Sequence, residues 1–150
     1  MTEENEINEI LRNYRNVAVV GLSRDIDKDS HKVAEYLKYK GYKIIPINPF
    51  ADEILGEKCY KSLLDLPYDI KRLIEIVDIF RPSKEILPIV EQVLQLRREY
   101  GRPFVIWMQL GIVNQEAAKM AKEAGMKVIM DRCMMIELKE IGSPMVNNKK

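Results

Sequence analysis

The sequence has little of what a metal site or a disulfide framework requires. Its 150 residues include two cysteines and one histidine. The cysteines are far apart in sequence, and together with the single histidine they do not give the ligand spacing of a zinc site. We therefore interpret Cys59 and Cys133 as free thiols in a reducing cytoplasm, and we expect no metal.

The chain also lacks an excess of one charge and a long apolar run. Its 24 basic and 23 acidic residues leave a formal net charge of +1, which argues against broad electrostatic capture of nucleic acid. No stretch approaches the ~20 apolar residues of a membrane span. The acidic start, MTEENEINEI, is unlike a signal peptide. We expect a cytoplasmic protein with neither a membrane nor a nucleic acid as its partner.

The composition that is present is that of one globular domain. Hydrophobic residues make up 47% of the chain and charged residues 31%, and no repeat or linker interrupts it. We expect a single domain over residues 1–140 and a flexible tail over residues 141–150.

Short apolar runs alternate with helical patterns along the chain. Strands are predicted over residues 17–21, 42–49, 73–80, 103–111 and 127–131. Helices are predicted over residues 3–14, 30–40, 61–67, 83–100 and 115–124. This alternation is typical of βαβ units. It predicts an α/β fold with a Rossmann-like, doubly wound, five-stranded parallel sheet, in which ligands bind beyond the carboxyl ends of the strands.

The loop after the first strand has one glycine where a dinucleotide fingerprint has three. Gly21 permits a sharp turn and a close approach of backbone to an anion, whereas Ser23 and Ile26 occupy the other two glycine positions. Ser23 and Arg24 add donors, and a helix beginning near Ser30 favours phosphate. An ordinary loop with solvated charges explains these residues equally well.

The later loops carry weaker signals, each with a structural alternative. Asn48 ends the second strand where an NAD enzyme has an acid, or it is simply a turn residue before Pro49. Arg81 follows the third strand and is either a hydrogen-bond donor to phosphate or an ordinary surface residue. Met108 ends the fourth strand and either lines a channel for a long, thin ligand or packs in the core. His31 is interpreted as a surface helix residue, and no pair of acids indicates catalysis.

Four segments in order resemble one known family. They are VAVVGLSRDIDKDSHKVAEYLKYKGYKIIPINP, EILGEKCYKSLLDLP, VDIFRPSKE, and WMQLGI followed by AGMKVIMDRCMMIE. Together they closely resemble small single-domain coenzyme A (CoA)-binding proteins and the CoA-binding domain of the succinyl-CoA synthetase α subunit, over residues 7–138. The synthetase subunit has a second domain with a phosphate-carrying histidine, which these 150 residues do not match.

The resemblance implies a protein that binds CoA or acyl-CoA without catalysis of its own, and no catalytic residue. The alternatives are an NAD(P)-dependent reductase, or the CoA-binding subunit of an acyl-CoA ligase completed by a partner chain. A homo-oligomer is also open. A longer, charged first loop suits CoA, which carries more phosphate than NAD.

The resemblance also implies a role for each binding residue. The pyrophosphate would be held by Gly21, Leu22, Ser23, Arg24 and Ser30, with Lys28 on the ribose phosphate. The ribose and adenine would meet Asn48 and Pro49, and the nucleotide would be covered by Phe80, Arg81 and Pro82. The pantetheine arm would be lined by Met108, Gln109, Gly111 and Ile112, with Cys133 near its thiol.

Overall fold

The computed structural model describes residues 2–147, and its centre is a parallel sheet of five strands. These strands are β1 (Asn16–Val20), β2 (Lys43–Ile47), β5 (Ile76–Ile79), β6 (Val105–Met108) and β7 (Lys127–Ile129). Their order across the sheet is β2-β1-β5-β6-β7, and every neighbouring pair is parallel. The predicted α/β, Rossmann-like, five-stranded sheet is confirmed.

Both faces of this sheet are buried, which explains why its strands read as apolar runs rather than alternating patterns. Val17, Val19 and Trp107 belong to the core on one face, while Ala18 and Met108 belong to the core on the other. Successive side chains of a strand point to opposite faces, so each strand contributes to both cores.

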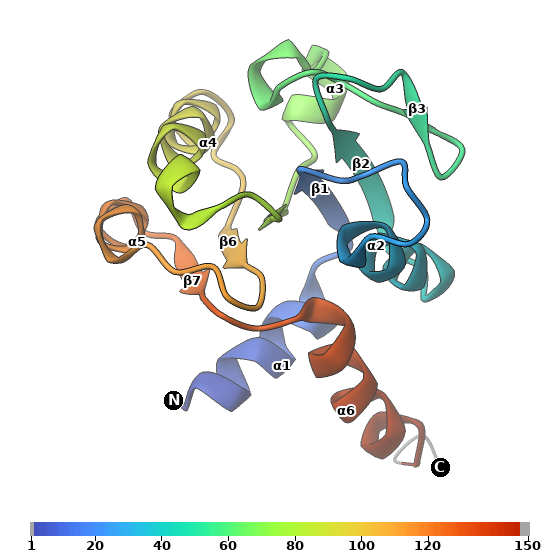
Figure 1. Cartoon of the computed structure of the whole chain (residues 1–150). Coiled ribbons are helices and arrows are strands. Elements are labelled where there is room, and N and C mark those ends of the chain that lie inside the picture. The colour runs from blue at the N-terminus through green and yellow to red at the C-terminus, as the bar shows by residue number, and fades with distance from the viewer. Residues whose placement is uncertain (1, 148–150) are drawn as a thin grey trace.

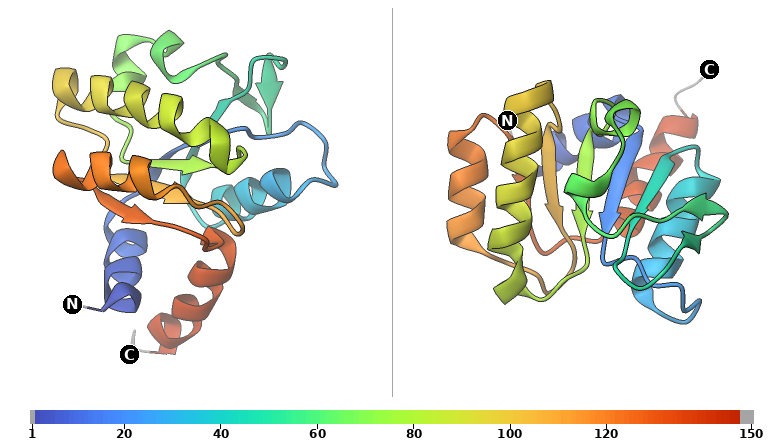
Figure 2. Two further views of the ribbon diagram at one scale, coloured as in Figure 1. Left: turned by 60° about the vertical axis from the view of Figure 1, so that its left-hand side comes forward. Right: turned by 90° about the horizontal axis from the view of Figure 1, so that it is seen from above.

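Helices cover the two faces unequally (Figures 1 and 2). The first face is covered by α1 (Glu3–Asn13), α2 (Asp29–Tyr39) and α6 (Met134–Asn147), whose buried residues join the Trp107 core. The second face is covered by α4 (Ile86–Tyr100) and α5 (Gln115–Glu123). None of the helices in residues 2–147 is long and apolar enough to cross a membrane.

Two predicted helix ends agree with the structure, and each of them has a local cap. The Asn114 side chain accepts a hydrogen bond from the Ala117 amide at 2.9 Å and so begins α5. Gly101, in the left-handed conformation at φ 75°, ends α4. The start of α2 was predicted differently: its N-cap is Lys28, which makes no side-chain cap bond.

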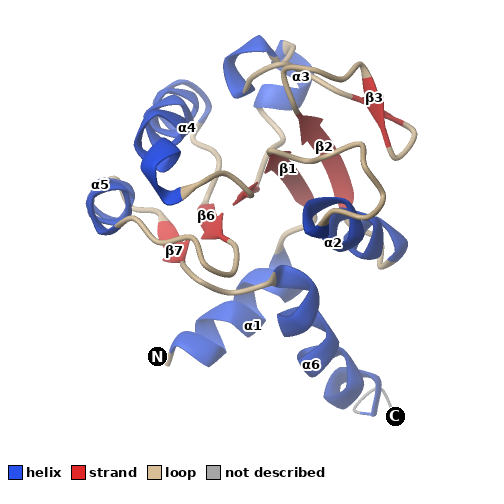
Figure 3. Cartoon of the chain, in the orientation of Figure 1, coloured by secondary structure: helices blue, strands red, loops and turns tan. Residues whose placement is uncertain are grey.

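Five further elements differ from the sequence prediction. The expected helix over residues 61–67 is a 3-10 turn, η1 (Leu63–Asp65), followed by the single-turn α3 (Tyr68–Lys71). A small antiparallel hairpin of β3 (Glu53–Ile54) and β4 (Glu57–Lys58) was not predicted (Figure 3). The first turn of the helix expected over residues 83–100 is a 3-10 turn, η2 (Ser83–Glu85).

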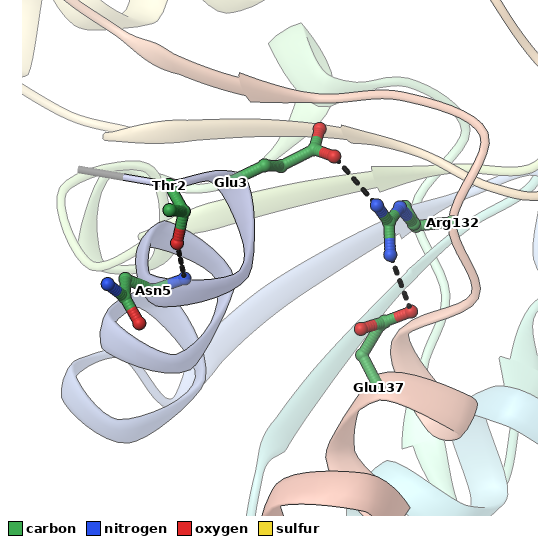
Figure 4. A network of polar contacts seen from close by, with 5 residues as sticks. All are labelled: Thr2, Glu3, Asn5, Arg132 and Glu137. Atoms are coloured by element: carbon green, nitrogen blue, oxygen red, sulfur yellow. Dashed lines mark hydrogen bonds and ion pairs between the residues drawn. The ribbon is translucent and has the colours of Figure 1, made fainter.

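Helix α6 was not predicted either, and it continues to Asn147 through most of the segment expected to be a tail. Residues 148–150 of that segment lie outside the described residues. The start of α6 is tied to α1 by one side chain (Figure 4). Arg132 donates to Glu3 at 2.8 Å and to Glu137 at 3.3 Å, so residues from the two ends of the domain share one cation.

The strand order indicates which edge of the sheet could bind a ligand. β1 lies between β2 and β5, so the chain leaves β1 toward one side of the sheet and later returns on the other. Loops that diverge in this way leave a crevice at the carboxyl ends of the two central strands.

Candidate functional site

A cavity of about 430 Å³ lies at the carboxyl ends of β1 and β2, beneath the first turns of α4. Its volume is within the range of small-molecule sites. Its lining consists of Val20, Gly21, Ser23, Ile47, Asn48, Pro49, Phe50, Lys61, Ser62, Leu63, Arg81, Glu85, Ile89 and Gln92. The topology thus places a cavity where doubly wound folds bind their ligands.

Gly21 joins two loops at the floor of this cavity. Its φ is +88°, a conformation that side chains rarely adopt. A Cβ at this position would lie 2.8 Å from the Phe80 carbonyl oxygen and 2.8 Å from the Arg81 Cδ. The glycine therefore allows the loop after β1 to touch the loop after β5, and no other residue fits without displacing backbone.

The rest of the first loop is held by groups at the start of α2. The Ser23 amide donates to the Ser30 Oγ at 2.9 Å, and His31 Nδ1 lies 2.8 Å from the Ser23 carbonyl oxygen. A carbonyl can only accept, so this ring nitrogen is the donor. His31 is buried, and its interpretation as a surface residue was wrong, because the ring is needed to hold Ser23.

The turn after β2 is fixed from three sides. Asn48 donates through Nδ2 to the Leu22 carbonyl at 2.8 Å and accepts from the Phe50 amide at 2.7 Å. Arg24 donates to the Phe50 carbonyl at 3.3 Å, and Lys61 donates to the Pro49 carbonyl at 3.2 Å. Asn48 is thus a turn residue, as its structural alternative predicted, and it also links the two loops.

The loop after β5 brings an ion pair to the cavity. Arg81 donates to one oxygen of Glu85 through Nε at 3.0 Å and through Nη2 at 2.8 Å. The two residues are one helical turn apart and about half exposed. Sequence reasoning identified the arginine but missed the glutamate, which reduces the positive charge that Arg81 presents.

Five of the residues predicted for the site line the cavity: Gly21, Ser23, Asn48, Pro49 and Arg81. The others lie outside its lining: Leu22, Arg24, Lys28, Ser30, Phe80, Pro82, Met108, Gln109, Gly111, Ile112 and Cys133. Among these, Leu22, Met108 and Cys133 are buried in the cores, whereas Lys28 is exposed. Met108 packs in the core, which was the alternative to its lining a channel.

The loop after β6 is tied to the loop after β7. The Gly111 amide donates to the Asp131 carboxylate at 2.7 Å, and the Arg132 amide donates to the Met108 carbonyl at 3.3 Å. The backbone at Gly111 has a φ of +79° with open space where a Cβ would lie. This loop extends the edge of the sheet beyond the cavity, and Leu110 is exposed on it.

A buried acid lies beneath this edge and was missed by sequence reasoning. Asp78 is fully buried on β5, and one of its oxygens accepts from Gln109 Nε2 at 2.6 Å. Its other oxygen has no partner among the described residues. Burial raises the pKa of Asp78 to about 7, against the hydrogen bond from Gln109, which lowers it. The sequence feature that could have identified this acid is a single charged residue within the apolar run IVDIF.

The thiols and acids of the described residues offer no metal site. Cys59 and Cys133 are both free and buried. Burial is the main cause that raises the pKa of the Cys59 thiol, whose sulfur contacts the Asn48 carbonyl at 3.5 Å. Both cysteines are therefore packed side chains in this structure.

Comparison with known proteins adds to this geometry. Residues 15–139 match a family model described as a CoA binding domain. The chain is 44% identical over 131 residues to the uncharacterized protein YneT of Bacillus subtilis, covering 87% of this chain and 90% of that protein.

Two further relatives are archaeal. A hypothetical protein from Pyrococcus horikoshii has the same fold, with a TM-score of 0.82 and 38% identity, covering 93% of this chain and 92% of that one. The α subunit of an ADP-forming acetate–CoA ligase II from Pyrococcus furiosus is 31% identical, and the match covers 83% of this chain but 28% of the subunit.

Proposed function

Because the chain belongs to the family of CoA binding domains, we propose that it binds coenzyme A, free or acylated, at the cavity beside Gly21. The observation that carries the proposal is the contact of Gly21 with the loop after β5. It leaves a cavity at the point where the strand order reverses. Folds of this kind bind nucleotides there.

The pyrophosphate of CoA would lie against the loop of Gly21 and Ser23, with Arg81 as the charged donor. A guanidinium can bind two phosphate oxygens through two parallel hydrogen bonds. In this structure two nitrogens of Arg81 donate to a single oxygen of Glu85, so the phosphate would replace that carboxylate. The adenosine would extend toward Asn48 and Pro49. Asn48 uses its side chain to join two loops and carries no charge that would repel a ribose phosphate.

The pantetheine arm would follow the edge of the sheet past Gly111 and Ile112. Gly111 leaves open space beside its backbone, and Asp131 holds its amide from the neighbouring loop. Met108 and Gln109 would support this path from below, because both are buried. The thiol end would then point toward the segment that contains Cys133.

A second candidate function is that of a CoA-binding component of an acyl-CoA ligase. The similarity to the ligase α subunit favours it, and the match covers 28% of that subunit. In this case a partner chain would supply the remaining chemistry. The two functions share the same CoA site and differ in whether a complex forms.

The test is to measure CoA binding by calorimetry, with NAD as the comparison ligand, and to look for carried CoA by native mass spectrometry. Arg81→Met should weaken CoA binding at least about tenfold, because a lost charge-assisted hydrogen bond costs roughly 1.5–3 kcal/mol. Arg72→Met, which removes an exposed arginine outside the cavity lining, is the matched control. Wild-type protein that binds NAD as tightly as CoA, or neither, would refute the proposal.

A further inference from the structure

One lysine of the cavity was not predicted, and the fold holds it in place through backbone pairing. Tyr60 forms a parallel bridge with Ile47 at the end of β2. The Tyr60 amide donates to the Pro46 carbonyl at 3.0 Å, and the Tyr60 carbonyl accepts from the Asn48 amide at 2.9 Å. Tyr60 is thus paired alongside the end of β2. The next residue, Lys61, lies in the lining of the cavity.

Lys61 forms no ion pair with a carboxylate of residues 2–147. Its ammonium group donates to the Pro49 carbonyl. Arg81, the other cation of the lining, is paired with Glu85 at 2.8 Å. Of the two cations that line the cavity, Lys61 is therefore the one without an ion pair among the described residues.

The position of Lys61 matches one part of a nucleotide. In doubly wound folds the end of the second strand faces the adenosine ribose, and a basic residue near it accommodates a phosphate on that ribose. Asn48 stands at the end of β2, and Lys61 contacts the next residue of the same turn. Lys28, by contrast, is exposed at the start of α2 and does not line the cavity.

We propose that Lys61 binds the 3′-phosphate on the ribose of CoA and makes the site discriminate CoA from dephospho-CoA. This proposal rests on the proposed function. It assigns the phosphate to Lys61 rather than to Lys28. The apolar floor of Ile47 and Leu63 beside Lys61 strengthens the attraction, because charges interact more strongly next to low-dielectric surface.

The test is a set of calorimetric titrations with CoA and with dephospho-CoA. Wild type should bind CoA about tenfold or more tightly than dephospho-CoA. Lys61→Met should bind both ligands equally, with the dissociation constant for dephospho-CoA unchanged. Lys61→Arg should keep the preference, since it keeps the charge. Lys28→Met is the matched control and should also keep it.

Each other outcome overturns the proposal. A preference that survives in Lys61→Met, or that is lost in Lys28→Met instead, assigns the phosphate elsewhere. Equal weakening of both ligands in Lys61→Met would mean that the lysine only supports the turn at Pro49. If wild type binds CoA without any preference, the role of Lys61 fails and the proposed function stands. If wild type binds neither ligand, both fail.

Discussion

Asp78 should make the stability of this protein fall as the pH rises. In the folded chain its carboxyl group is buried, with one oxygen bonded to Gln109 and the other without a partner in residues 2–147. Burial raises its pKa from 3.8 to about 7. Between these two pH values the folded state keeps a proton that the unfolded state has lost, so the free energy of unfolding decreases with pH and levels off above about pH 7.

The magnitude follows from the shift. A change of about three pKa units at about 1.4 kcal/mol each gives a loss of about 4 kcal/mol when Asp78 is fully ionised. Asp78→Asn has nearly the same shape as the protonated acid and can still accept from Gln109. The variant should therefore match wild type near pH 4 and be more stable by about 4 kcal/mol at pH 8.

Urea denaturation from pH 4 to pH 8.5 measures this difference. Trp107 is the single tryptophan and is paired with Asp78 in the sheet, so its fluorescence reports unfolding of this region. Asp69→Asn, at an exposed carboxylate, is the control and should show no such trend. A difference between Asp78→Asn and wild type that is independent of pH, or that grows toward acid, would refute the reasoning.

Three more substitutions test the site and its frame. Gly21→Ala should lower the free energy of unfolding by about 1–3 kcal/mol in urea denaturation, because a Cβ there meets the Phe80 carbonyl; unchanged stability would contradict this. Glu85→Gln should tighten CoA binding roughly two- to fivefold at low salt by freeing Arg81, and calorimetry in 1 M salt should abolish the gain. Asn114→Ala should cost about 1 kcal/mol in the same denaturation assay through loss of the α5 cap, whereas Asn114→Ser should restore most of it.

Much of the fold was predictable because it is encoded locally. Alternating apolar runs and helical patterns predicted all five strands of the sheet. The predicted helices over residues 83–100 and 115–124 end and begin where Gly101 and Asn114 cap α4 and α5. The resemblance to CoA-binding domains is also confirmed, since it depends on an ordered set of segments. Helix α6 was missed because Gly142 and Pro144 are poor helix formers, and local propensity does not register the docking of its first turn on the Trp107 core.

The candidate site was harder to predict, because its details depend on contacts between distant residues. Gly21 was identified from its position after a strand. Lys61 was not, because a backbone bridge between Tyr60 and Ile47 brings it to the cavity. Ser30 and His31 turn inward toward Ser23 rather than outward, for the same kind of reason. The positions of these side chains depend on hydrogen bonds between residues that are not neighbours in the sequence, and a local sequence pattern does not reveal such bonds.

The shared cation at Arg132 has a consequence for how the chain is made. Glu3 leaves the ribosome before Arg132, which lies 129 positions later in the chain. Until that late segment emerges, α1 has an apolar face with no α6 beside it, while the β1 and β2 strands can already pair. Contacts of such high sequence separation form slowly. The nascent protein therefore passes through a state in which α1 has been synthesised but its contacts with α6 cannot yet form.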